Sequence, residues 1–222
     1  GEEISPVGEG VATTATIVEL HYNTEAKYEA EWISNEGLQK RLQYIEQNKG
    51  NLHVQEYAFT LENLVNQPYF EENQVFNHIN SMQEITHYTT TKGQYAAGVE
   101  LVKIFSPVPC LKHGAILIDT PGLNDPMKVR DSITKEQAIM ADCILFVMRA
   151  DKFGTESERQ FLIEVLNKTR ASSLKIIITH IDRMQINQDY ESIRHAVREW
   201  LNRVCDHPLV YSAQIYLFNA SY

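Results

Sequence analysis

The sequence predicts an α/β domain of three layers, with a mostly parallel sheet, one antiparallel edge strand and a helical insertion. Three short apolar runs, each rich in β-branched residues, lie at 143–148, 174–178 and 215–218. Amphipathic helical patterns separate these runs along the chain. Because strands that alternate with helices form parallel sheets buried on both faces, we interpret the three runs as neighbouring strands.

The first half of the chain has a different pattern. Residues 11–20 favour a strand, and residues 25–48 are interpreted as a helix because large apolar side chains recur roughly on one side. The stretch 55–92 is polar, rich in Gln and Asn, and also favours helix. We therefore interpret residues 21–98 as a largely helical insertion between two strands that lie side by side, and we assign it no chemistry.

The second half alternates regularly. Residues 99–105 and 115–119 favour strands, and the roughly nine residues between them are too few for a helical crossover, which predicts antiparallel pairing. Helical patterns fill the remaining segments, at 128–142, after the capping-box pair Thr155 and Glu158, and at 190–204. Together these elements make the whole chain, 1–222, one domain.

Composition excludes several classes of protein. The 222 residues carry a net charge of −9, which argues against a non-specific nucleic-acid binder, since such proteins need clustered cations. No apolar run approaches the roughly 18 residues of a membrane span. The three cysteines are too widely spaced for a disulfide framework or a zinc motif, so a reduced, cytoplasmic protein is expected.

The segment Asp119-Thr120-Pro121-Gly122 follows a predicted buried strand. An aspartate at the carboxyl end of a strand lies at the edge where α/β sheets bind ligands, and it can hold Mg²⁺ through water. Gly122 has no Cβ, so its N–H group can meet a terminal phosphate closely. The alternative interpretation is a strand-ending turn punctuated by Pro and Gly.

Two further segments carry candidate ligands. Asp182, in the segment 179–182 (THID), has a carboxylate that can accept two N–H bonds from a guanine edge, although a polar turn after a strand is ordinary. Upstream, a hydroxyl of Thr13 or Thr14 can ligate Mg²⁺, although the local sequence is also a simple run of high β-propensity.

The order of these three segments resembles that of a Ras-like P-loop GTPase, and its detail resembles the dynamin superfamily, especially bacterial dynamin-like proteins. Residues 1–8 (GEEISPVG) resemble the approach to that family's switch one, and residues 12–17 (ATTATI) its threonine segment. Residues 118–125 (IDTPGLND) resemble its switch two. The resemblance covers most of residues 1–20 and 99–222.

This resemblance implies a role for each matching residue. Thr14, with Thr13 as the alternative, would bind Mg²⁺ and the γ-phosphate, and it is the expected catalytic residue. Asp119 would hold Mg²⁺ through water, and Gly122 would donate its N–H group to the γ-phosphate. The guanine would be bound by Thr179, His180 and Asp182, and covered by Asn219, Ala220 and Ser221, with residues 212–213 as the alternative for the cover.

The resemblance also implies partners and a place in the cell. The intact protein would hydrolyse GTP to GDP with Mg²⁺, associate with itself through this domain, and couple hydrolysis to membrane remodelling through regions outside this chain. It would be cytoplasmic and peripheral at a membrane. No nucleic-acid partner is expected.

The sequence departs from the family pattern in three ways. The phosphate-binding loop Gly-x-x-x-x-Gly-Lys-Ser/Thr is not found among the 222 residues, and Gly1 falls where the helix after that loop should end. We therefore expect a truncated domain that is weak or inactive alone. His180 stands where the family has Lys, and Leu123 stands where Ras-like enzymes carry a water-orienting Gln, so no general base is predicted.

Two other functions remain open at this stage. A pseudo-GTPase scaffold would keep the fold and use residues 21–98 to bind a protein partner without nucleotide turnover. The retention of both Mg²⁺-binding and base-reading residues argues against the scaffold. An ATPase of the same fold leaves Asp182 unexplained.

Overall fold

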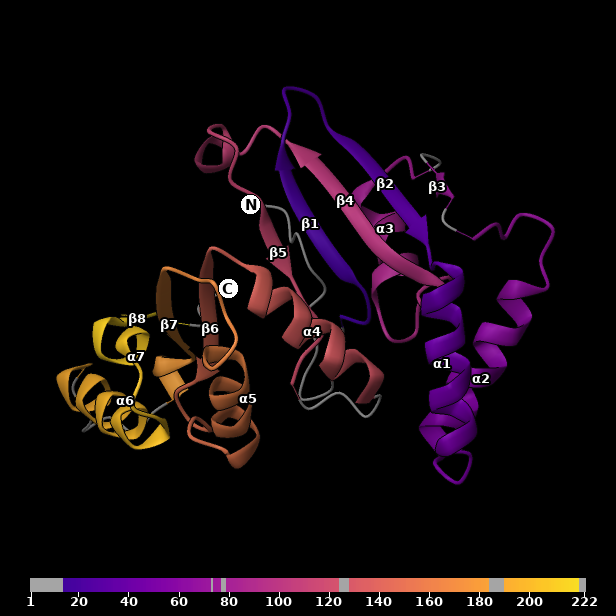
Figure 1. Cartoon of the computed structure of the whole chain (residues 1–222). Helices are drawn as coiled ribbons and strands as arrows, with labels where there is room; N and C mark the ends of the chain where they lie inside the picture. The colour runs from indigo at the N-terminus through magenta and orange to yellow at the C-terminus, as the bar shows by residue number, and fades with distance from the viewer. Residues whose placement is uncertain (1–13, 73, 77–78, 124–127, 184–189, 220–222) are drawn as a thin grey trace. The chain divides into compact units, whose positions relative to one another are not determined.

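The computed structural model describes residues 14–72, 74–76, 79–123, 128–183 and 190–219 (Figure 1). The chain divides into two compact units, Gly1–Thr134 and Lys135–Tyr222. Each unit is built around its own sheet.

The first unit contains a five-stranded mixed sheet with the order β3-β2-β4-β1-β5. The strands are β1 (Ile17–Tyr22), β2 (Lys27–Trp32), β3 (Val75–Phe76), β4 (Val99–Ser106) and β5 (Leu117–Asp119). As expected, β1 and β4 lie side by side despite their separation in sequence, and they pair in parallel, with Ile17 opposite Leu101. The other three pairings in this sheet are antiparallel, more than expected.

The predicted pairing of 99–105 with 115–119 is wrong. In the structure β1 lies between β4 and β5, and β5 pairs antiparallel with β1, with Val18 opposite Asp119. The short connection, which includes the 3₁₀ turn Pro109–Leu111, reverses the direction of the chain as predicted. A short connection sets the relative direction of two strands, but here it also carries the chain past the end of β1.

The helix predicted over 25–48 begins only at Asn35, because the preceding residues form β2. The segment Lys27–Trp32 alternates, and its Ala30 and Trp32 side chains are buried on the core face of the sheet. Ser34 then caps the helix, since its hydroxyl accepts a hydrogen bond from the N–H group of Gly37 at 3.0 Å. Over residues 27–32 the alternation with a period of two, typical of a strand, therefore indicates the structure better than the helical pattern does.

Among the described residues, the rest of the insertion contributes three helices and the short strand β3, and its helices pack into the core of the first unit. Its helices are α1 (Asn35–Gln47), α2 (Leu52–Val65) and α3 (Met82–Thr89), and α1 lies beside α2 (Figure 1). The buried guanidinium of Arg41 on α1 donates to the backbone carbonyl of Ala97 and to the hydroxyl of Tyr57. These bonds satisfy a buried charge and tie α1 to the segment before β4.

Gly93, in the loop after α3, is expected to tolerate no side chain. A Cβ atom there would lie 2.5 Å from the backbone oxygen of His87 and 2.7 Å from that of Thr86. Because backbone atoms cannot move aside cheaply, Gly93→Ala should lower the free energy of unfolding by about 1–3 kcal/mol in urea denaturation. Gly50→Ala is the matched control, since nothing lies within 4 Å of its Cβ position. Equal stability of the two variants would contradict this packing.

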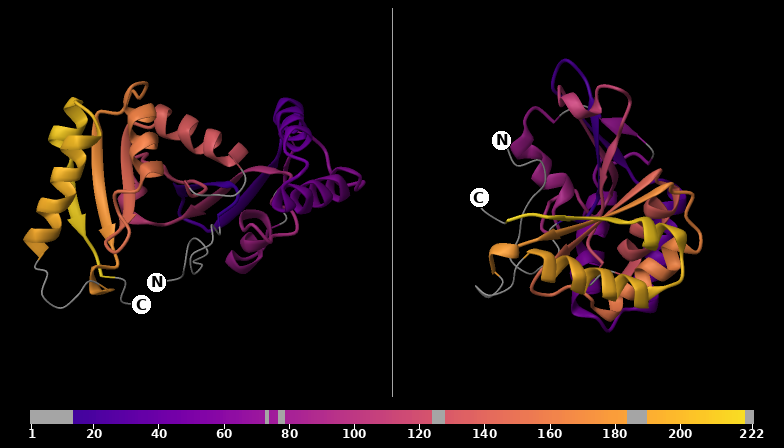
Figure 2. Two further views of the ribbon diagram at one scale, coloured as in Figure 1. Left: turned by 90° about the horizontal axis from the view of Figure 1, so that it is seen from below. Right: turned by 90° about the vertical axis from the view of Figure 1, so that its left-hand side faces the viewer.

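The second unit contains a parallel sheet with the order β6-β7-β8. Its strands are β6 (Cys143–Arg149), β7 (Ser173–Thr179) and β8 (Gln214–Leu217), which confirms the three predicted strands within one or two residues. Its helices are α5 (Glu156–Leu166), α6 (Tyr190–Val204) and α7 (Pro208–Ser212), and α4 (Lys128–Met140) precedes β6. Figure 2 shows α6 running along one side of these strands.

The two faces of this sheet differ in burial. On one face Phe146 is buried and its ring stacks on Phe161 of α5, with the ring centroids 5.8 Å apart. On the other face Leu145, Val147 and Tyr216 are 46%, 58% and 42% exposed. The apolar runs that predicted burial on both faces are therefore covered on one face by the described helices.

Candidate functional site

Thr14 and Asp119 come together in the first unit. Their side chains are 105 positions apart in sequence, and the Thr14 hydroxyl donates to a carboxylate oxygen of Asp119 at 3.4 Å. The antiparallel pairing of β5 with β1 explains this contact, because it places the end of β5 beside the start of β1. Sequence reasoning placed each residue at the end of a strand, but only the register shows that these ends meet.

The loop after β5 is anchored from α4. Pro121 is buried, and its backbone carbonyl accepts a hydrogen bond from the hydroxyl of buried Thr134 at 2.9 Å. Gly122, the next residue, is exposed. Sequence reasoning missed Thr134, because the pattern over 128–142 did not distinguish it from its neighbours. Its bond anchors the residue directly before Gly122 to α4.

The donor set formed by Thr14 and Asp119 fits Mg²⁺. A hydroxyl and a carboxylate are hard oxygen ligands, and Mg²⁺ usually takes one or two protein oxygens together with water and substrate phosphates. Among the residues that the structure describes, no three or more His, Cys, Asp or Glu side chains gather as metal ligands. Thr13, the alternative to Thr14, lies outside the described residues.

In the second unit, Thr179 ends β7 and begins the predicted guanine loop. The Thr179 hydroxyl donates to the carbonyl of Met148 on β6 at 3.3 Å, and its backbone carbonyl accepts from the N–H group of Ala150 at 2.9 Å. His180 follows with a φ of 58°, in the left-handed region that few residues other than Gly adopt. A 3₁₀ turn, Ile181–Arg183, then presents Asp182, which is exposed.

The orientation of His180 follows from its neighbour. Because the Thr179 hydroxyl gives its proton to Met148, its oxygen can accept from the Nδ1 atom of His180, which lies 3.0 Å away. In the neutral imidazole this places the proton on Nδ1 and leaves Nε2 as the accepting nitrogen. His180 therefore offers a nucleotide a chemistry different from that of a lysine ammonium.

Asn219 lies at the same end of the sheet as Asp182. The backbone carbonyl of Phe218 accepts from Ile181 at 3.4 Å, and the Phe218 N–H group donates to Ile178 at 2.8 Å. These bonds hold the end of β8 beside the predicted guanine loop. Ser212 and Ala213 precede β8 and therefore lie at the opposite end of this strand. Of the two alternatives for covering the base, Asn219 is the one at the end of the sheet where Asp182 lies. Ala220 and Ser221 lie outside the described residues.

Sequence reasoning also missed a charged pair at this edge. Arg149 ends β6 directly opposite Thr179, and its guanidinium donates two hydrogen bonds to Asp151, at 3.0 Å and 2.8 Å. These bonds lower the pKa of Asp151 and raise the pKa of Arg149. An Arg and an Asp two residues apart, after an apolar strand, could have indicated the pair.

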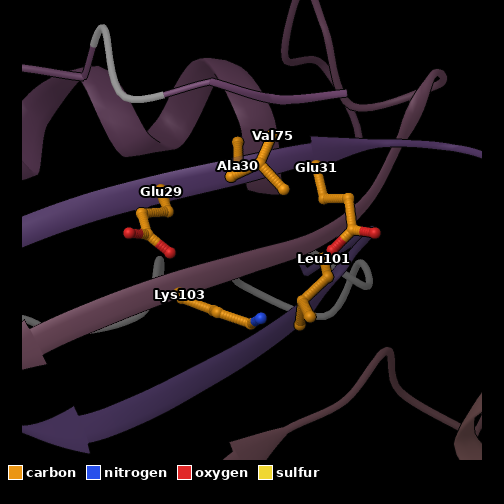
Figure 3. A pocket seen from close by; sticks show the side chains of 6 residues that line it. All are labelled: Glu29, Ala30, Glu31, Val75, Leu101 and Lys103. Atoms are coloured by element: carbon orange, nitrogen blue, oxygen red, sulfur yellow. The ribbon is translucent and has the colours of Figure 1, made fainter. Parts of the chain in front are cut away.

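Two pockets of the first unit contain none of the predicted site residues. One lies on the sheet, where the carboxylates of Glu29 and Glu31 and the ammonium of Lys103 surround a small opening (Figure 3). The other is open, has a volume of about 270 Å³, and has walls that include His21 and Phe105. The candidate site residues therefore lie at strand ends and outside these two pockets.

Similarity to known protein families shows to which family the chain belongs. The model of the Dynamin family matches residues 1–181, most of the chain. The chain belongs to the dynamin family. The dynamin family consists of GTPases that generally use Mg²⁺ with GTP.

Two bacterial proteins are similar to this chain in sequence. Dynamin-like protein 1 of Campylobacter jejuni is 24% identical over 163 residues, which cover 73% of this chain and 22% of the relative. An uncharacterised protein of Caldicellulosiruptor is 28% identical over 86 residues, covering 38% of this chain and 21% of the relative. The chain thus spans about a fifth of the length of each of these relatives.

Solved structures of bacterial dynamins have the same fold. Two chains from studies of an oligomerised bacterial dynamin pair match with TM-scores of 0.70, at 23% and 22% identity. They cover 93% and 96% of this chain, and 28% and 35% of the solved chains. This likeness confirms the predicted α/β, Ras-like fold class. The oligomerised dynamin pair in those structures is described as providing a mechanism for the long-range sensing and tethering of membranes.

None of the helices in the described ranges is both long and apolar enough to cross a membrane.

Proposed function

We propose that this chain is the GTP-binding and GTP-hydrolysing part of a dynamin-like protein. The observation that carries the proposal is the contact between Thr14 and Asp119, which brings two predicted Mg²⁺ ligands from distant segments to 3.4 Å. Membership of a family of GTPases supports the same proposal.

Each half of the nucleotide would be bound by one set of residues. Thr14 and Asp119 would hold Mg²⁺, with Asp119 acting through water, and Gly122 would donate its N–H group to the γ-phosphate. Bound Mg²⁺ would neutralise charge on the phosphates during transfer to water. Asp182 would accept the N–H groups of guanine, while Thr179 and His180 shape the loop and Asn219, Ala220 and Ser221 cover the base.

The membrane context is a further part of the proposal. The solved relatives are an oligomerised pair described in terms of membrane tethering, which supports self-association of the intact protein and peripheral attachment to a membrane from the cytoplasm. Because the chain spans only part of its relatives, we assign GTP turnover and membrane remodelling to the complete gene product. This chain alone would be weak or inactive.

The proposal is tested by measuring phosphate release by the complete gene product. GTP should be hydrolysed at least about tenfold faster than ATP, because ATP lacks the N–H pair that Asp182 accepts. Chelation of Mg²⁺ with EDTA should abolish hydrolysis, and added Mg²⁺ should restore it. Equal rates with both nucleotides would contradict the base-reading role, and hydrolysis that resists EDTA would contradict the metal role.

One observation favours the scaffold as a second candidate. His180 stands where the family has Lys, and Thr179 fixes its ring in one orientation. If the complete gene product binds neither GTP nor GDP in calorimetry, the scaffold that binds a protein partner becomes the better interpretation.

A further inference from the structure

The insertion holds the segment that carries Thr14. Thr14 forms an isolated antiparallel bridge with Thr90, just after α3. The N–H group of Ala15 donates to the carbonyl of Thr89 at 2.6 Å. The hydroxyl of Thr16 donates to the carbonyl of Tyr88 at 3.0 Å, with the carbonyl of Ala96 at 3.5 Å. Three successive residues before β1 are therefore bound to the end of α3 and the loop after it.

These contacts are buried, so water does not replace them readily. Thr16 is 3% exposed and Thr89 is fully buried. The Thr16 hydroxyl has one proton, and of the two backbone carbonyls that it faces, the carbonyl of Tyr88 is the nearer at 3.0 Å. A buried hydroxyl that loses its acceptor retains the full cost of desolvation, so the segment cannot shift away from α3 without a penalty.

The support behind these contacts is itself well packed. The rings of Tyr88 and Tyr95 stack with centroids 4.8 Å apart, and Tyr95 meets Trp32 of β2 edge-on at 6.2 Å. The N–H group of Tyr95 donates to the carbonyl of His87 at 2.9 Å, which closes the loop after α3. The end of α3 is thus connected through aromatic rings to the sheet.

We propose that Thr16 and residues 88–90 position Thr14 for the γ-phosphate and Mg²⁺ end of GTP, so that the insertion is part of nucleotide recognition. This inference rests on the proposed function. Thr16 is a positioning residue, because it acts through the backbone of the segment that ends in Thr14. Its effect should depend on the γ-phosphate, since GDP lacks the group that Thr14 would meet.

The test is the affinity of the complete gene product for two nucleotides. Thr16→Val keeps the shape of the side chain but removes the hydroxyl. It should weaken binding of a non-hydrolysable GTP analogue with Mg²⁺ by about tenfold, the effect of one buried hydrogen bond, while GDP affinity changes less than about twofold. Thr16→Ser should restore the analogue affinity. Thr60→Val is the matched control, because the Thr60 hydroxyl donates to the carbonyl of Glu56 at an exposed position of α2.

A second measurement does not depend on the folding of the Thr16 variant. Trp32 contacts Tyr95, so the wild-type fluorescence should change when the GTP analogue binds but not when GDP binds, and Trp32→Phe should abolish this change. The positioning role would be overturned if Thr16→Val weakened the binding of the GTP analogue and of GDP equally. It would also be overturned if Thr16→Val left the ratio of these two affinities unchanged and the Trp32 fluorescence of the wild type did not change when the analogue bound. Wild-type protein that binds neither nucleotide would instead overturn the proposed function.

Discussion

Asp182→Asn in the complete gene product is expected to reverse its nucleotide preference from guanine to xanthine. A carboxylate accepts two N–H bonds from guanine, whereas the asparagine amide offers one acceptor and one donor. Xanthine carries an oxygen where guanine carries its amino group, so it accepts from that new donor. Losing a charged hydrogen-bonding pair should weaken GDP binding by about a hundredfold, and xanthosine diphosphate should recover most of that loss.

The two dissociation constants can be measured by calorimetry. Asp206→Asn is the matched control, because Asp206 is also exposed and lies in the second unit, where it accepts a bond from the Tyr211 hydroxyl at 2.9 Å. The control should bind GDP like the wild type. An Asp182→Asn protein that still prefers GDP would remove Asp182 from the guanine site.

Asp119→Asn is expected to weaken the apparent affinity for Mg²⁺ by about 10–100-fold, the usual effect of losing a group that holds a metal through water. The substitution removes a negative charge at the end of β5 and leaves an amide opposite the Thr14 hydroxyl. The Mg²⁺ concentration that supports half-maximal GTP hydrolysis should therefore rise, while GDP affinity without Mg²⁺ stays close to that of the wild type.

The measurement is a Mg²⁺ titration of phosphate release. Asp142→Asn, just before β6, serves as the control for loss of a carboxylate elsewhere, and its titration should match the wild type. A normal Mg²⁺ requirement in Asp119→Asn would show that the contact with Thr14 is structural and that the metal is held by other groups.

Local patterns predicted the second unit well. The capping box of Thr155 and Glu158 is present in both directions, and α6 has the predicted bounds, with Ile193, Val197 and Leu201 buried. Such features depend on residues a few positions apart, so periodicity and caps suffice to predict them. The position of Asp119 at the end of its strand, and of Asp182 just after its strand, is also a local property.

Features that depend on distant segments were not predictable in the same way. The direction of β5 followed from its short connection, but its neighbour depended on β1, which lies about a hundred residues upstream. The contact of Thr16 with Tyr88 depends on how α3 packs, and no pattern around Thr16 indicates it. The left-handed φ of His180 was not predicted from the sequence either.

The parallel pairing of β1 with β4 has a consequence for synthesis of the protein. Ile17 leaves the ribosome about 80 residues before its partner Leu101, a delay of several seconds at about 5–20 residues per second. During that time β1 lacks both of its partner strands, β4 and β5, whereas β2 can already pair with β3. The strand next to Thr14 is thus made long before either of the strands that pair with it, so its backbone hydrogen-bonding groups remain unpaired with a sheet over this interval.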